Sequence, residues 1–372
     1  MSFLPYFFVN ILTSEEYKSW SVMLKYFKGS FFVTIVGIIC AVWWGEKTHG
    51  NGLLSLFIVT FLAILEVTLS FDNAVINAIK LEKMTEKWKH RFLTWGIAIA
   101  VFGMRFLFPV LVVSAFSGLS LLAVTKLALY DVDKYAHYLH VIHAPLVAFG
   151  GAFLMMLFLS YFFNPDKTTH WITGIERPLL CCSEIKSIEV IICLTMIGIL
   201  QAYLPEEIRL SVVLSGFTGV ILYLIIDSLS NLLERIAERK ASLAGETAKL
   251  GFIGFLYLEL IDASFSLDGV LGAFAISKDI VIITIGLAIG AMFVRSLTIF
   301  MVDKKTLKEY LFLEHGAHWA IGFLALIMFY STIQEVPEVI TGMVGLVIVG
   351  AAFISSIMHN KKNGISDKNI TD

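Results

Sequence analysis

The sequence predicts an all-α polytopic membrane protein, with about ten transmembrane helices arranged as two inverted five-helix repeats. Its 372 residues are 58% hydrophobic and only 16% charged, whereas about a quarter of the residues in soluble proteins are charged. Several apolar runs reach the roughly 20 residues that a helix needs to cross a bilayer. Two acidic segments of similar sequence also occur inside such runs, far apart in the chain, and they indicate an internal repeat.

Ten apolar segments are expected to span the membrane. The first and ninth are short enough to be tilted or half-inserted, and positions 119–130 could also dip into the bilayer. We expect an N-terminal interfacial segment at 1–30, a first repeat at 31–204, a second at 210–357 and a tail at 358–372. The expected spans are 31–45, 53–79, 92–115, 144–163, 187–204, 210–228, 250–276, 280–301, 318–330 and 336–357.

The distribution of basic residues predicts an orientation in the cytoplasmic (inner) membrane. With both termini inside, twenty-one of the 28 lysines and arginines fall on cytoplasmic segments and five on outer loops. This is the bias that cytoplasmic loops normally show. The net charge of -2 and the scattered basic residues give no sign of a nucleic-acid partner. The four cysteines have no metal-finger spacing.

The repeat is clearest in an acidic segment followed by an arginine segment. Residues 66–74 (EVTLSFDNA) and 262–270 (DASFSLDGV) each place an aspartate six residues after an acid and two after a serine. Residues 96–105 (GIAIAVFGMR) and 286–295 (GLAIGAMFVR) then follow in the same order. Because each half has an odd number of spans, the halves must be inverted. Inverted repeats place binding sites near the midplane at broken helices.

The acidic segments predict a cation site. Glu66, Ser70 and Asn73 share one helix face, and a break near Ser70 and Ser266 would bring Asp72 and Asp268 onto it while freeing backbone carbonyls as ligands. Oxygen donors of this kind suit Mn²⁺, Mg²⁺ or Ca²⁺. The expected metal ligands are Glu66, Asp72, Asn73, Glu259, Asp262 and Asp268, supported by Ser70 and Ser266.

Other interpretations of these residues remain open. The acids could form buried ion pairs with Arg105 and Arg295, although five acids outnumber two arginines. The arginines could bind an anionic substrate, but compensation of charge in the empty site is favoured over that role. The pairs His140 and His143, and His315 and His318, have metal-ligand spacing and are possible residues of a transport mouth. Ordinary histidines at the ends of spans are favoured over that role.

The two acidic segments and their arginine segments resemble the signatures of the TerC family of integral membrane proteins, within the LysE-type exporter superfamily. The resemblance covers roughly residues 55–110 and 250–330. It implies that Asp72, Asn73 and Asp268 are site residues, with Glu66 and Asp262 beside them, and it associates the chain with tellurium resistance and manganese export. The chain departs from the common pattern at Asp268-Gly269 and in a longer middle segment that includes 170–176.

These observations lead us to expect a membrane exporter of divalent cations, with Mn²⁺ as the favoured substrate, that works by alternating access around midplane carboxylates. One alternative is an exporter of amino acids or other small organic solutes. Another is a non-transporting membrane anchor for a tellurite or metal stress-response complex. We expect no enzyme activity and no cofactor besides the transported cation. The expected partners are the lipid bilayer and the metal substrate, and a second copy or cytoplasmic stress-response proteins are candidate partners.

The orientation can be tested by cysteine labelling. A cysteine placed after Lys134 should react with a membrane-impermeant maleimide added to intact cells, because the connection at 116–143 is expected outside. A cysteine in the connection at 80–91 should react only after the membrane is opened. The reverse pattern at both positions would contradict the orientation.

Overall fold

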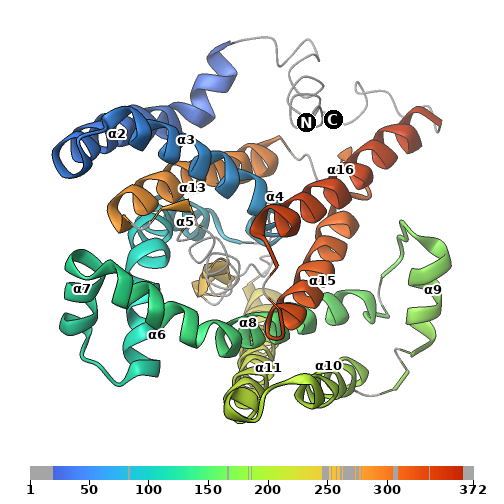
Figure 1. Cartoon of the computed structure of the whole chain (residues 1–372). Coiled ribbons are helices and arrows are strands. Elements are labelled where there is room, and N and C mark those ends of the chain that lie inside the picture. Colours follow the sequence, from blue (N-terminus) through green and yellow to red (C-terminus); the bar gives the residue numbers. More distant parts are fainter. Residues whose placement is uncertain are drawn as a thin grey trace.

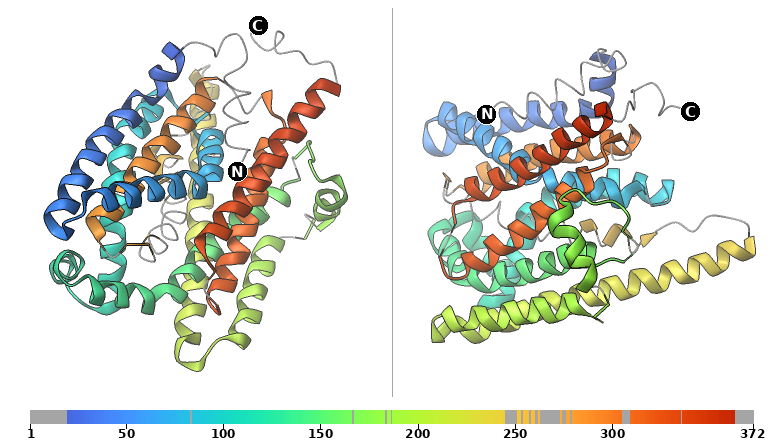
Figure 2. Two further views of the ribbon diagram at one scale, coloured as in Figure 1. Left: turned by 45° about the horizontal axis from the view of Figure 1, so that its top comes forward. Right: turned by 90° about the vertical axis from the view of Figure 1, so that its right-hand side faces the viewer.

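The computed structural model is a bundle of helices, with no strand among the residues that it describes (Figure 1). The described residues are 20–244 and 251–362, except 83, 166, 183, 186, 253, 257, 260, 261, 263–272, 274, 275, 278, 305–308 and 335. Two views show the helices stacked in layers, with α11 extending beyond its neighbours at one end (Figure 2). The all-α polytopic fold class is therefore confirmed.

The helices of the first half follow one another with short connections. They are α2 (Trp20–His49), α3 (Gly52–Leu69), α4 (Phe71–Glu82), α5 (Glu86–Ala98), the π-helix η2 (Ile99–Leu107), α6 (Phe108–Ser117), α7 (Leu121–Tyr130), α8 (Val132–Phe162), α9 (Thr173–Cys182), α10 (Ile188–Leu200) and the 3₁₀ turn η3 (Gln201–Tyr203).

The second half contains four long helices whose bounds are described. They are α11 (Glu206–Ala244), α13 (Ile280–Asp303), α15 (Leu313–Ser331) and α16 (Glu338–Lys362). Helices therefore cover nine of the ten expected spans, and most of the span expected at 250–276 lies outside the described residues. Six described segments are long and apolar enough to cross a bilayer: Lys25–Thr48, Gly52–Leu69, His137–Phe162, Glu206–Leu229, Ile280–Asp303 and Ile340–Lys362.

The first acidic segment contains a helix interruption at Ser70. Its φ of −102° and ψ of 15° differ from the α-helical values, and α3 ends and α4 begins on either side of it. Ser70 still takes part in helix-type hydrogen bonds. Its amide donates to the Glu66 carbonyl at 2.9 Å, and its carbonyl accepts from the Ala74 amide at 3.1 Å. The expected unwound stretch is thus a single residue. The matching break near Ser266 lies outside the described residues.

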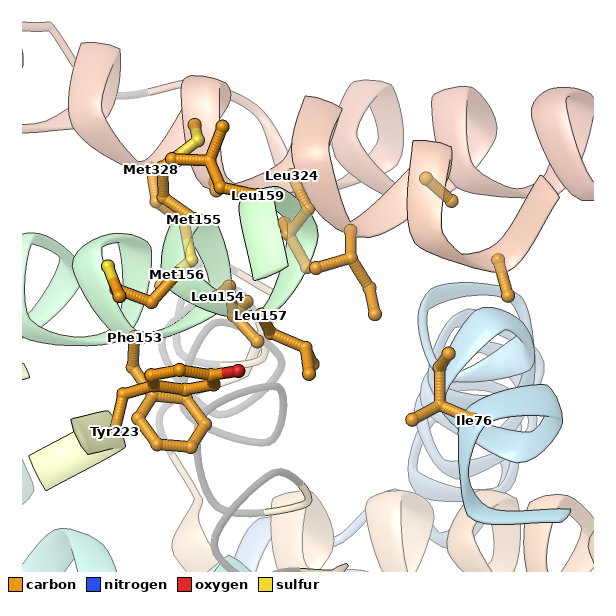
Figure 3. Close-up of a cluster of buried hydrophobic side chains, with 14 of the residues drawn as sticks. Ile76, Phe153, Leu154, Met155, Met156, Leu157, Leu159, Tyr223, Leu324 and Met328 are labelled. Carbon is orange, nitrogen blue, oxygen red and sulfur yellow. The ribbon is translucent and has the colours of Figure 1, made fainter. Parts of the chain in front are cut away.

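One part of the core is formed where α8 packs against α11 and α15 (Figures 1 and 3). Consecutive residues of α8 are buried around its whole circumference, including Phe153, Leu154 and Met155. The ring of Phe153 meets that of Tyr223 on α11 edge to face, with centroids 5.7 Å apart, and Met328 of α15 is in the same cluster. A helix that is apolar all round belongs in such a buried position.

The other part of the core brings α13 against α2 and α3 (Figure 1). Glycines allow this close approach. A Cβ atom at Gly290 would lie 2.5 Å from the Cβ of Glu66 and 2.8 Å from the carbonyl oxygen of Ala63, and one at Gly286 would lie 2.7 Å from the Cβ of Leu62. Small residues are typical of tight helix contacts in membranes. Gly290 therefore fixes the distance between α13 and the helix that carries Glu66.

This packing predicts that Gly290→Ala destabilises the protein. The added methyl group must displace α3 or α13, at a cost of about 1–3 kcal/mol. The measurement is the melting temperature of the purified protein in detergent. Gly198→Ala is the matched control, because a Cβ there meets nothing within 4 Å and alanine favours a helix. Equal melting temperatures for Gly290→Ala and wild type would contradict the packing argument.

Candidate functional site

A cluster of buried polar side chains joins the two expected repeats through Arg105. Its guanidinium forms an ion pair and a hydrogen bond with Glu66 on α3, and it lies 3.7 Å from Asp262 of the second acidic segment. The hydroxyl of Ser70 donates to Glu66 at 2.9 Å, and the Asn73 amide group donates to Asp262 at 2.7 Å. The structure thus brings Glu66, Asn73 and Asp262 together, with Ser70 in support.

A second ion pair lies near the first and is formed by Arg295 and Glu259, 3.7 Å apart. Arg295 also donates to the Phe92 carbonyl at 2.7 Å, and its guanidinium carbon lies 4.1 Å from the centre of the Phe92 ring. Both arginines therefore pair with acids, as the ion-pair interpretation expects.

Arg105 lies in the π-helix η2, which interrupts the helical run between α5 and α6. The segment 96–105 and its counterpart 286–295 begin with the same pattern, but the counterpart is a regular part of α13. Short π-helical stretches within α-helices are frequent at functional sites. The two arginines thus lie in different types of helix, although the segments that contain them have matching sequences.

Several buried oxygen atoms of this region accept no hydrogen bond in the described part of the chain. They are Oδ1 of Asn73, Oδ1 of Asn77, Oδ2 of Asp262 and both carboxylate oxygens of Glu259. A small cavity, with room for about one water molecule, is lined by Asn77, Arg105, Asp262, Arg295 and Thr298 together with apolar side chains. Buried polar atoms are normally satisfied, so these oxygens are suited to a positively charged ligand.

Asn77 and Thr298 were not predicted from the sequence. Asn77 follows Asn73 by four residues, which places both on one face of α4, and Thr298 follows Arg295 by three on α13. These spacings of four and three residues could have identified both residues from the sequence. No three His, Cys, Asp or Glu side chains among the described residues are close enough to form a metal site by themselves. The donors here are instead carboxylates mixed with carboxamides and arginines.

Asp72 is buried, but it does not join the cluster around Arg105. One carboxylate oxygen accepts the amide of Asn73 at 2.9 Å, as an acid in the first turn of a helix often does. The other lies 3.6 Å from where a Cβ at Gly345 of α16 would be. In the described part of the chain no hydrogen bond or ion pair joins Asp72 to Glu66 or Asp262. Asp268 and Ser266 lie outside the described residues.

The histidine pairs occupy different environments. His140 is exposed and His143 is half-buried on α8, whereas His315 and His318 are buried on α15. The ring of His318 stacks on Tyr161 with centroids 3.6 Å apart. His315 instead faces Glu176, with Nδ1 3.2 Å from the carboxylate. The second pair therefore belongs to a polar cluster of its own.

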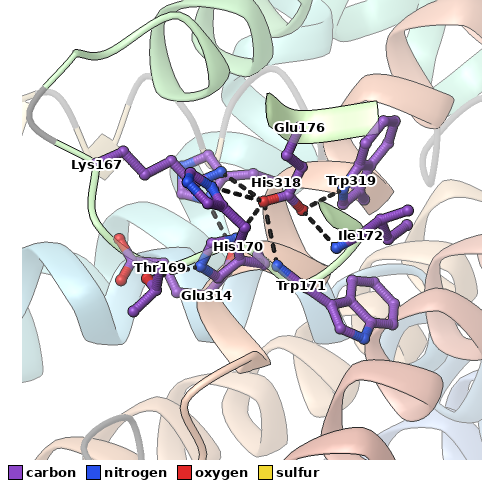
Figure 4. Close-up of polar contacts among 10 residues, drawn as sticks. Lys167, Thr169, His170, Trp171, Ile172, Glu176, Glu314, His318 and Trp319 are labelled. Carbon is purple, nitrogen blue, oxygen red and sulfur yellow. Dashed lines mark hydrogen bonds and ion pairs between the residues drawn. The ribbon is translucent and has the colours of Figure 1, made fainter. Parts of the chain in front are cut away.

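This second cluster is built around the buried carboxylate of Glu176 on α9 (Figure 4). Lys167 donates to it at 3.0 Å and the indole of Trp319 at 3.1 Å. The backbone amides of Trp171 and Ile172 each donate at 3.2 Å. Burial alone would raise the pKa of the Glu176 carboxyl, but the hydrogen bonds that it accepts outweigh burial and hold the pKa well below its usual range. Glu176 is thus a satisfied anion that ties α9 to α15.

The cluster predicts that Glu176→Gln lowers stability by about 3 kcal/mol at pH 7, because Lys167 is left buried without its counter-charge. The low pKa makes this contribution fully present above the ordinary glutamate value of 4.5, and it is lost as the pH falls further and the carboxylate is protonated. The melting temperatures of wild type and variant should therefore converge in acid. Glu184→Gln, which changes an exposed acid of the same connection, is the control. A constant difference between wild type and Glu176→Gln down to strong acid would contradict the argument.

Comparisons with known proteins place the chain in a family. The family described as "Protein of unknown function (DUF475)" matches residues 71–363. The "Uncharacterized membrane protein YceF" of Bacillus subtilis (strain 168) is 30% identical over 115 residues, which cover 30% of this chain and 42% of that protein. No solved structure matches the chain. Neither match bears the TerC name, so that resemblance stays a prediction. With its apolar helices and a family match over most of its length, the chain is a membrane protein that belongs to the DUF475 family.

Proposed function

We infer that the protein transports divalent cations across the membrane, with Mn²⁺ as the favoured substrate and export as the direction. The observation that carries this inference is the set of buried oxygen atoms around Arg105 and Arg295 that accept no hydrogen bond from the described residues. Leaving such atoms without a hydrogen bond in a low-dielectric interior is costly, even where an arginine lies 3.7 Å away. A cation that binds there would satisfy them.

The chemistry of these atoms favours a hard cation. Asn73, Asn77, Glu259 and Asp262 offer carboxylate and carboxamide oxygens, which suit Mn²⁺, Mg²⁺ and Ca²⁺ better than ions that seek sulfur or imidazole. The choice of Mn²⁺ among these ions rests on the resemblance to the TerC family. The direction of transport rests on the same resemblance.

The balance of charge also supports a divalent substrate. Apart from Glu176 in the second cluster, the buried acids among the described residues are Glu66, Asp72, Glu259 and Asp262, and they outnumber the two buried arginines. Charged groups within a membrane mark transport pathways when they face a cavity. The small cavity beside Arg105 fits a dehydrated ion more readily than an amino acid, so the solute-export alternative would need a much larger opening.

The location of the site supports alternating access. Glu66 and Asn73 belong to the first expected repeat, while Asp262 and Glu259 belong to the second. A site shared between two repeats can open to either side when one repeat rocks against the other. The interruption at Ser70 lies directly between the two first-repeat residues.

The test is Mn²⁺ flux into proteoliposomes that hold a fluorescent metal indicator. Asp262→Asn and Glu259→Gln should each reduce the flux at least about tenfold, because neutral oxygens compensate poorly for the lost hydration of a dication. Both changes preserve side-chain shape. Asp72→Asn distinguishes two roles for Asp72. The Mn²⁺ flux should fall if the carboxylate is a metal ligand, and it should be unchanged if the carboxylate only caps α4, because asparagine caps a helix as well as aspartate does.

Glu86→Gln is the matched control, because Glu86 is an exposed acid that pairs with Lys89 on α5, and its flux should equal that of wild type. Competition by Fe²⁺, Zn²⁺, Co²⁺, Ca²⁺ and amino acids would define the substrate class. Normal amounts of folded Asp262→Asn and Glu259→Gln with full Mn²⁺ flux would rule out this site. The membrane-anchor alternative would then be preferred.

A further inference from the structure

The two buried arginines have corresponding positions in the repeated segments but unlike surroundings. Arg295 on α13 donates to the Phe92 carbonyl and packs on the Phe92 ring. Arg295 is therefore anchored to α5 by two groups that are not candidate ligands, and it pairs with one candidate ligand, Glu259.

Arg105 instead lies between two candidate ligands. It pairs with Glu66 from the first repeat and with Asp262 from the second, and it lines the small cavity. Oδ2 of Asp262, which accepts no hydrogen bond from the described residues, is the atom that lies 3.7 Å from Arg105 Nη1. A cation that entered the cavity to bind Asp262 would meet the guanidinium at the same oxygen.

The carboxylates of Glu66 and Asp262 need a positive charge between them when no substrate is bound. Breaking a buried ion pair leaves an uncompensated charge and is strongly destabilising. Arginine remains protonated at all physiological pH values, and its planar fork can contact two carboxylates at once. It can therefore contact both Glu66 and Asp262 and compensate one of their two negative charges without taking up a proton from either side of the membrane.

We propose that Arg105 is a tethered counter-cation, which occupies the cation position in the empty protein and is displaced from Asp262 when the substrate binds. This proposal rests on the divalent-cation transport inferred above and adds a role to one residue of that site. The π-helix at 99–107 provides a non-standard backbone on which the side chain can be re-aimed. Substrate and Arg105 then bind in turn to the same carboxylate.

The proposal separates two kinds of flux. Net export requires the empty protein to reorient, and in that state Arg105 supplies the missing positive charge. Exchange of Mn²⁺ for Mn²⁺ requires only the loaded protein to reorient, and in that state the metal supplies the charge. A variant without the cation at position 105 should therefore keep exchange and lose net export.

The experiment compares Arg105→Gln with Arg295→Gln as the matched control, using MnCl₂ as the probe. Calorimetry on the purified proteins measures Mn²⁺ affinity, and proteoliposomes measure both net flux and isotope exchange. Arg105→Gln should bind Mn²⁺ about tenfold more tightly, because a competing positive charge near the ligands is removed. It should retain exchange while net flux falls at least about tenfold. Arg295→Gln should lower the amount of folded protein and tighten binding less than Arg105→Gln, because Arg295 pairs with one candidate ligand whereas Arg105 contacts two.

A further variant keeps the proposal falsifiable if Arg105→Gln does not fold. Arg105→Lys preserves the positive charge but not the two-carboxylate geometry, so it should retain part of the net flux. Loss of net flux and exchange together in folded Arg105→Lys, or Mn²⁺ binding by Arg105→Gln no tighter than wild type, would overturn the counter-cation role. Neither result affects the proposed function as long as wild type binds and transports Mn²⁺. Wild type without divalent-cation binding or flux would overturn both.

Discussion

The contact on which this structure most depends is the buried bridge from Glu66 through Arg105 to Asp262. Charged groups in an apolar interior are tolerated only when groups of opposite charge lie in close geometry. That requirement fixes α3, η2 and the second acidic segment relative to one another. The glycines of α13 serve the same end, because Gly290 lets the backbone of α13 approach the stem of Glu66.

The interruption at Ser70 shows how the local backbone supports the bridge. Ser70 is the residue between α3 and α4, and its hydroxyl donates to Glu66. Beyond it, Asn73 reaches across to Asp262 while Asp72 holds the amide of Asn73. A continuous helix would place Asp72 and Asn73 differently around the axis. The break is therefore the local feature that connects the two acidic segments.

The carboxylates of the two polar clusters differ in how many hydrogen bonds they accept, and this difference indicates different roles. The carboxylate of Glu176 receives donors from a lysine, an indole and two backbone amides, so it needs no ligand. The oxygens of Glu259 and one oxygen of Asp262 accept no hydrogen bond in the described residues. A saturated cluster stabilises a connection, while an unsaturated one is suited to binding. His315 lies beside this satisfied carboxylate, although its own Nδ1 has no hydrogen-bond partner among the described residues.

The sequence by itself determined the helical membrane class, the acids and arginines of the central cluster, and the position of a helix break. These follow from composition, the length of apolar runs and the cost of charge in a bilayer, all of which are local properties. Only the tertiary structure decided which partners these residues have. The pairing of Asn73 with Asp262, the separate location of Asp72, the contribution of Asn77 and the unlike surroundings of Arg105 and Arg295 depend on contacts between helices distant in the chain. The repeat in sequence suggested equal arginines, but packing against Phe92 is available to one of them, so equal motifs acquired different environments.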